Sequence, residues 1–358
     1  MKNDEILSQI TDFCRRSDMA ETTFGRRAVN DGKLVHRLRE GKRITIDTLD
    51  RINGFIATST PGGVAPPRGL VVPPEKRDPR GNFRFFENRQ RYLLFVHTCS
   101  EKRVIADRVA LELAAIHPRP PALRVFDAGM GDGTVLARVL RAMHGRFPHM
   151  PFYVAGKELS LEDVRLTLDK VPDRLFEHPA SVFVFTNMYY AEAPWLTPKN
   201  SAAAASMIWH EVALRGASSG DFEAQIAELG PFLEQNWRAN LSPGNAMPIY
   251  ERPVALVLYR DDHRFLLDSI IPRAGRAEAN FDLVIASQPY RAKSSVNFRA
   301  KRIIAPLARA LRGGGRLIGI HSHGGDPGLE IIQAVWPGEN PFAVSRHEIL
   351  RAVKYELG

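Results

Sequence analysis

The sequence predicts an α/β protein whose doubly wound, mostly parallel sheet follows a small all-α N-terminal domain. Three observations carry this prediction. In the second part of the chain, apolar strand patterns alternate with amphipathic helical patterns, as in βαβ units. A glycine-rich turn, residues 127–133, connects the first of these strands to a helix. Residues 1–58 contain helical patterns and no strand pattern.

The composition is that of a folded globular protein. The chain has 358 residues, of which 44% are hydrophobic and 25% charged, which suffices for two domains and a sizeable core. No stretch approaches the ~20 apolar residues of a membrane span, and the polar start lacks a signal-peptide core, so we expect a cytoplasmic protein. Cys14 and Cys99 are the only cysteines, which excludes a disulfide framework and a cysteine-based zinc site. The net charge of +9 favours acidic partners such as nucleic acid or anionic metabolites.

Three segments follow one another along the chain. Residues 1–58 form the helical domain, and residues 59–82 are a linker whose six prolines and four glycines prevent a helix. Residues 83–358 form the α/β domain.

The N-terminal segment has the pattern of a helix, a turn and a basic helix. Helices are predicted over 20–28, 33–40 and 46–56, with a turn at 29–32. This pattern resembles the helix-turn-helix domains of DNA-binding repressors. Leu34, Val35 and Leu38 would then face inward, and the residues toward DNA would be Lys33, His36, Arg37 and Arg39. Residues 1–58 carry 11 Lys or Arg and nine Asp or Glu, so the alternative is a small bundle for docking or dimerisation. Repressor-type domains bind DNA in pairs, so DNA binding would require a homodimer.

The α/β segment begins with a helix that ends at a group of prolines. The predicted elements are a helix over 88–116, strand 123–129, helix 134–145, strand 151–159, helix 161–171, strand 181–188, a mostly helical insertion at about 189–280, strand 281–290, helix 297–311, strand 316–324, and helices over 327–335 and 345–357.

The turn after the first strand reads Asp127-Ala-Gly129-Met-Gly131-Asp-Gly133. A dinucleotide-binding fingerprint would place its third glycine at Thr134. An aspartate two residues before the first glycine would repel a pyrophosphate, but it suits the ammonium group of an amino acid. Glycines here allow a sharp turn and a ligand lying against the main chain.

This combination resembles motif I of the class I S-adenosylmethionine (SAM)-dependent methyltransferases, over roughly residues 90–324. The resemblance implies that Asp127 serves the methionine end of SAM and that Gly129, Gly131 and Gly133 form the turn beneath it. It also implies that Glu158 accepts the ribose hydroxyls. Asn187 would accept the adenine amino group, and Met188 would pack on the ring. The alternative is that Glu158 and Asn187 cap helices or turns.

The fourth strand ends in Ser287-Gln288-Pro289-Tyr290. Methyltransferases that act on the amino groups of adenine or glutamine resemble this stretch, but they have a proline where Gln288 stands. The resemblance implies that Ser287 lies at the cofactor and that Gln288 and Tyr290 contact the methyl acceptor. A simple turn leaving the strand is an equal alternative.

Three further features bear on the site. His321 and His323, followed by Asp326, are better explained as strand-end caps than as metal ligands, so no metal is expected.

Residues 291–316 contain eight Lys or Arg and no acid, which predicts a solvated basic face; Arg291 and Lys293 could meet an acidic substrate. The family normally adds a sixth strand and a reversed seventh strand after the fifth, and none is evident here. Either residues 189–280 close the sheet or the chain is truncated.

The expected function is SAM-dependent methyl transfer to an unidentified acceptor, acidic or amine-bearing, by a chain that also binds DNA through residues 1–58. The alternative is a transcriptional regulator whose methyltransferase-like domain senses SAM or a metabolite without turnover.

Overall fold

The structure is a computed structural model that describes residues 3–17, 19–29, 31–40, 42, 48–49, 51–52, 55–56, 100–241, 248–290, 294–321, 327–335, 337–338 and 343–358. The chain divides into two compact units, Met1–Arg84 and Phe85–Gly358. The predicted linker over 59–82 lies outside the described residues. Among the described helices, none has both the length and the apolar character needed to cross a bilayer.

The described part of the N-terminal unit includes the helices α1 (Asn3–Arg16), α2 (Glu21–Val29) and α3 (Leu34–Arg39). As predicted, Leu34, Val35 and Leu38 are buried, and they pack with apolar side chains of α1 and α2. A Cβ atom on Gly25 would lie 2.3 Å from the Asp31 carbonyl oxygen, so the close approach of α2 to the following turn requires glycine. Of the predicted helix over 46–56, the described residues 48–49, 51–52 and 55–56 are helical.

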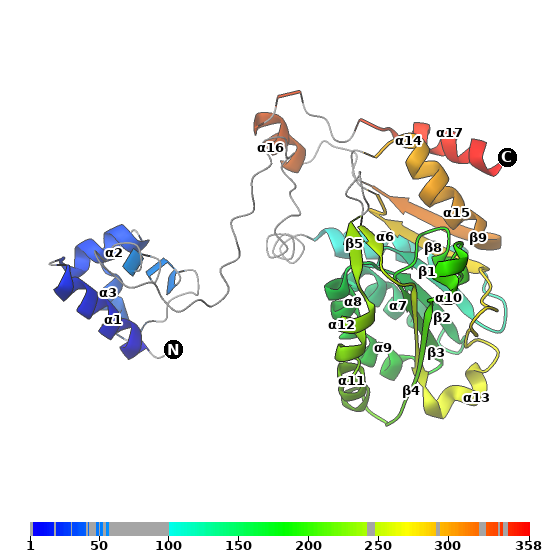
Figure 1. The fold of residues 1–358 in the computed structure, drawn as a ribbon, viewed down its shortest axis with the longest axis horizontal. Coiled ribbons are helices and arrows are strands. Elements are labelled where there is room, and N and C mark those ends of the chain that lie inside the picture. The colour runs from blue at the N-terminus through cyan, green and yellow to red at the C-terminus, as the bar shows by residue number, and fades with distance from the viewer. Residues whose placement is uncertain are drawn as a thin grey trace. The chain divides into compact units, whose positions relative to one another are not determined.

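The second unit is the predicted α/β domain, with a seven-stranded, mostly parallel sheet in the order β4-β7-β3-β2-β1-β8-β9 (Figure 1). Its strands are β1 (Leu123–Ala128), β2 (Phe152–Lys157), β3 (Ser181–Thr186), β4 (Ile208–Leu214), β7 (Val254–Arg260), β8 (Phe281–Ser287) and β9 (Leu311–Ile320). A separate antiparallel pair consists of β5 (Ala239–Leu241) and β6 (Pro248–Tyr250).

Helices cover both faces of the sheet. The α-helices described in this unit are α6 (Glu101–Glu112), α7 (Thr134–Arg146), α8 (Leu161–Leu168), α9 (Val171–Glu177), α10 (Ser201–Ala205), α11 (Ser219–Ala227), α12 (Gly230–Asn236), α13 (Arg264–Leu267), α14 (Val296–Phe298), α15 (Ala305–Arg309), α16 (Pro327–Val335) and α17 (Arg346–Leu357), and a π-helical turn spans Arg299–Ile304. The segment predicted as one helix over 161–171 is thus two short helices, and the predicted strand over 316–324 begins earlier, at Leu311.

The prediction that residues 189–280 are mostly helical was wrong. This segment supplies two strands of the sheet: β7 pairs antiparallel with β3, and β4 pairs parallel with β7. All seven residues of β7 are buried, as expected of a strand inside a sheet covered on both faces. Residues 189–280 therefore contribute strands to the sheet, as one of the two alternatives expected. The two strands extend the sheet beyond β3, at the opposite end from β9.

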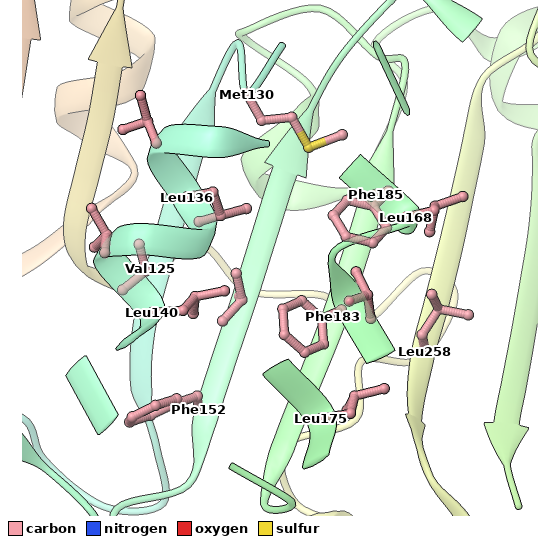
Figure 2. Close-up of a cluster of buried hydrophobic side chains, with 14 of the residues drawn as sticks. Val125, Met130, Leu136, Leu140, Phe152, Leu168, Leu175, Phe183, Phe185 and Leu258 are labelled. Carbon is pink, nitrogen blue, oxygen red and sulfur yellow. The ribbon is translucent and has the colours of Figure 1, made fainter. Parts of the chain in front are cut away.

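The core has two layers because successive strand residues point to opposite faces. Val125 packs in the layer covered by α6, α7, α8, α9, α11 and α12, whereas the next residue, Phe126, packs in the layer covered by α13, the π-helical turn, α15 and α17. Figure 2 shows part of the first layer, in which Met130 from the glycine turn packs near Phe185 of β3. The turn that follows β1 is therefore anchored in the core.

Candidate active site

The predicted site residues converge because β1, β2, β3 and β8 are parallel neighbours. Ala128 at the end of β1 is paired with Lys157, which is paired with Thr186. Asp127 is paired with Ile285 of β8 on the other side. The carboxyl ends of these strands therefore meet at one edge, where open α/β sheets bind their ligands.

The glycine turn has positive φ angles, which residues with a side chain rarely adopt. Gly129, Gly131 and Gly133 have φ angles of 120°, 54° and 73°. A Cβ atom on Gly133 would lie 2.7 Å from Thr167 Oγ1 and 3.0 Å from its Cα, so Gly133 allows the turn to pack against α8. A Cβ atom on Gly131 would meet no described atom within 4 Å. Gly131 is thus the glycine of the turn that has room for a ligand.

Asp127 lies beneath this turn, at 1% exposure. Its Oδ1 atom has no hydrogen-bond partner among the described residues. Burial, and then the nearby charge of Glu158, raises the pKa of the Asp127 carboxyl to about 7. A buried carboxyl of this kind can ionise at neutral pH when a cation enters and pairs with it.

Glu158 follows β2, and its carboxylate binds the backbone around it. Oε2 accepts a hydrogen bond from the Gly131 amide at 3.0 Å, and Oε1 accepts from the amides of Leu159 and Ser160 at 2.7 and 2.9 Å. The carboxylate therefore joins the end of β2 to the glycine turn. Glu158 thus caps a turn, which is the alternative interpretation of the sequence, and its predicted contact with a ribose stays a prediction.

The structure assigns packing roles to Asn187 and Met188. The Asn187 amide donates to the Arg252 carbonyl and accepts from the Val254 amide, both at 2.8 Å, and it thereby ties the end of β3 to the start of β7. Met188 is completely buried in the core. These side chains face protein in the described structure, and their predicted contacts with adenine stay predictions.

The end of β8 has an unusual conformation. Gln288 is exposed and has a φ of 49°, in the left-handed region, where a residue other than glycine is strained. Its backbone N–H donates to the Ile320 carbonyl of β9 at 2.8 Å. Ser287 is half-buried beside the turn, with its carbonyl oxygen 4.0 Å from a Cβ built on Gly129.

Tyr290 lies at the β8–β9 side of this edge. The buried Arg299 guanidinium is 4.7 Å from the centre of its ring, and the His321 ring centre is 6.1 Å away. Burial raises the pKa of the Tyr290 hydroxyl, which keeps the hydroxyl protonated at neutral pH. Tyr290, which is predicted to contact the methyl acceptor, thus lies in a cluster of an aromatic ring, a cation and an imidazole.

Tyr190 is a site residue that the sequence reading missed. Its hydroxyl donates to the Pro289 carbonyl at 2.8 Å and lies 3.8 Å from a Cβ built on Gly129. The Lys157 ammonium group is 4.7 Å from the centre of its ring. The signal was available, because Tyr190 follows the third strand by only four residues.

Comparisons with protein-family models and with curated proteins find no match.

Two further predictions concern cations and metals. Several basic residues of 291–316 are exposed, as predicted, namely Lys301, Arg302, Arg309 and Arg316. By contrast, Arg299 is buried and Arg312 pairs with the buried Asp282. Arg291 and Lys293 lie outside the described residues, as do His323 and Asp326. Within the described part of the chain, no three His, Cys, Asp or Glu side chains come together in a metal-binding group.

In the N-terminal unit, the predicted DNA contacts Lys33, His36, Arg37 and Arg39 are all exposed. Three of them also form ion pairs within the unit: His36 with Glu40 at 3.3 Å, Arg37 with Asp31 at 2.8 Å, and Arg39 with Glu21 at 2.6 Å. DNA phosphates would compete with these acids for the same side chains.

Proposed function

We propose that the carboxyl edge of the sheet binds SAM and that the chain transfers its methyl group to an acidic or amine-bearing acceptor. The observation that carries this proposal is the buried Asp127 carboxyl, whose Oδ1 has no partner in the described structure, beneath a turn of three glycines with positive φ. A buried acceptor without a partner is costly to maintain. A ligand that brings a cation or a donor to it would offset that cost.

The residues present fit SAM at its methionine end. Its ammonium group would pair with Asp127, and the low dielectric around the carboxyl makes such a pairing stronger than in water. Gly131, which has open space above it, would lie beneath the ligand. The positive end of the α7 dipole favours a negative group such as the methionine carboxylate, and the Asp132 carboxylate already accepts from the Thr134 amide there.

Glu158 would hold the ribose hydroxyls. A carboxylate has about four acceptor sites, and three are engaged by the amides of Gly131, Leu159 and Ser160. Accepting both hydroxyls therefore requires that the hydrogen bond from Gly131 be released or shared. Ligand binding would in this way be linked to the conformation of the glycine turn.

When bound, SAM supplies an electrophilic methyl group on a sulfonium. The chain then needs to orient the acceptor, exclude water and accept a proton where the acceptor carries one. Gln288 and Tyr290, which follow the end of β8, are the residues that we assign to contact with the methyl acceptor. The strained backbone of Gln288 keeps this side chain at the exposed edge.

Isothermal titration with SAM and with S-adenosylhomocysteine tests the binding. We expect binding by the intact chain, a loss of at least tenfold in affinity for Asp127→Ala, and no change for Asp107→Ala, an exposed aspartate of α6. A failure of the intact chain to bind either compound would refute the proposal.

A second candidate function is sensing of SAM or a metabolite by a transcriptional regulator. It is favoured by the glutamine that stands where amino-group methyltransferases have proline, and by the α2–turn–α3 arrangement, in which Gly25 permits close packing and α3 exposes basic residues. DNA binding through residues 1–58 as a homodimer is part of both candidates. Incubation of the protein with cell extract and methyl-labelled SAM separates them, because a sensor would bind SAM without labelling any acceptor.

A further inference from the structure

The Tyr190 side chain crosses the carboxyl edge of the sheet. Tyr190 belongs to the loop after β3, yet its hydroxyl donates to the Pro289 carbonyl after β8. In the sheet, β2 and β1 lie between these two strands. The phenol therefore spans the ends of the strands that carry Glu158 and the glycine turn.

The surroundings of Tyr190 overlap with those expected of a ligand at Asp127. The hydroxyl lies 3.8 Å from a Cβ built on Gly129, beside the Ser287 carbonyl. Lys157 lies over the ring, and the charges of Asp127 and Glu158 act on the hydroxyl. A group that lay over Gly129 on its way to Asp127 would therefore contact the phenol.

We propose that Tyr190 closes the cofactor site in the free protein and that its hydroxyl leaves the Pro289 carbonyl when SAM binds. This inference rests on the proposed function. The exchange is energetically modest, since one neutral hydrogen bond and one cation–π contact with Lys157 are given up.

The displacement has a consequence for the acceptor. With Tyr190 turned away, the Pro289 carbonyl becomes available at the end of β8, next to Gln288 and Tyr290. A carbonyl oxygen can only accept hydrogen bonds. It therefore selects a methyl-accepting substrate that donates a hydrogen bond through an N–H or O–H group. Cofactor binding would precede acceptor binding, because it uncovers this group.

The experiment follows Tyr190 directly. The chain has eight tyrosines, so protein labelled with 3-fluorotyrosine gives a tractable fluorine spectrum, in which the signal absent from Tyr190→Phe belongs to Tyr190. We expect this signal to shift on saturation with S-adenosylhomocysteine. Stopped-flow mixing should also show association about fivefold faster for Tyr190→Phe, which keeps the ring and lacks the hydrogen bond. Tyr189→Phe, an exposed neighbour, should associate at the rate of the unmodified chain.

A Tyr190 signal that does not move at saturating S-adenosylhomocysteine overturns the inference, whatever the association rates are. In that case the Tyr190 side chain keeps its conformation and only supports the site, and titration of the unmodified chain with S-adenosylhomocysteine still shows binding. If the unmodified chain binds neither SAM nor S-adenosylhomocysteine, both this inference and the proposed function are refuted. The two failures are therefore distinguishable.

Discussion

The Glu158 carboxylate lies 3.0 Å from the Gly131 amide nitrogen, and this hydrogen bond joins the end of β2 to the turn that follows β1. The same carboxylate binds the amides of the next two residues. It therefore stabilises the turn before any ligand is present, and it is also the group that we assign to the ribose.

Glu158→Gln should weaken the binding of S-adenosylhomocysteine by about 10- to 100-fold. The amide oxygen of glutamine can still accept hydrogen bonds, but bonds to a neutral acceptor are roughly half as strong as bonds to a carboxylate. Titration calorimetry measures the change, with Glu162→Gln on the exposed side of α8 as the matched control. Equal affinities for the two variants would show that Glu158 serves only the turn.

The stability of the domain should depend on pH through Asp127. Its pKa rises from 3.8 to about 7 on folding, so between these values the folded state retains a proton that the unfolded state has lost. The contribution is fully present below pH 4 and is lost as the pH rises to 7. The difference between the two pKa values corresponds to on the order of 4 kcal/mol in the free energy of unfolding. Urea unfolding should therefore show Asp127→Asn to be more stable than the unmodified chain at pH 8, but not at pH 4.

The affinity for the ligand should depend on pH in the opposite way to the stability, and should rise as the pH rises. A cationic group beside Asp127 lowers its pKa, so S-adenosylhomocysteine should bind more weakly at pH 5.5 than at pH 8 and should release a proton near pH 6.5. Calorimetry in buffers of different ionisation enthalpy counts that proton. The stabilised Asp127→Asn variant should bind poorly at both pH values and release none.

The two later glycines of the turn should respond differently to alanine. Gly131→Ala should cost about 1 kcal/mol, because φ is positive but the space is open. Gly133→Ala should cost about 2–4 kcal/mol, because its Cβ would also meet Thr167 at 2.7 Å. Denaturant titration compares the pair, and equal losses would mean that the contact with α8 relaxes freely.

In the N-terminal unit, Arg37→Ala combined with Arg39→Ala should weaken binding to a random-sequence DNA duplex and reduce the slope of its salt dependence by roughly two. Stability should change by less than about 1 kcal/mol, since exposed ion pairs contribute little. Arg15→Ala removes a comparable ion pair on α1 and should bind like the unmodified chain. Equal binding by all three proteins would exclude α3 as the DNA contact.

The central sheet could be predicted because its signals are local. Each of β1, β2, β3 and β8 is an apolar run that ends in a polar residue or a glycine, and parallel pairing then brings those ends together. β7 has the same signal in Val254–Arg260, but it lies in the segment 189–280, which the sequence predicts to be mostly helical. Its antiparallel placement beside β3 depends on pairing between distant segments, which no local pattern encodes.

The orientation of the site side chains was less predictable. Asn187 has the position along the chain that the resemblance implies, yet its amide ties down β7. That partner exists only because β7 lies beside β3. Tyr190 was overlooked for a similar reason, because its reach to Pro289 joins residues that are 99 positions apart.

The sheet order also governs when the site can come into existence. β1 is flanked by β2, which follows it closely, and by β8, whose Asp282 binds the Arg124 amide from 158 residues further along the chain. At ribosomal elongation rates of 5–20 residues per second, that separation corresponds to roughly 8–30 s. Until then the nascent domain exposes one edge of its central strand to solvent and to chaperones. The newly made chain must therefore be translated to the end of β8, at Ser287, before it can hold a ligand across the ends of β1 and β8.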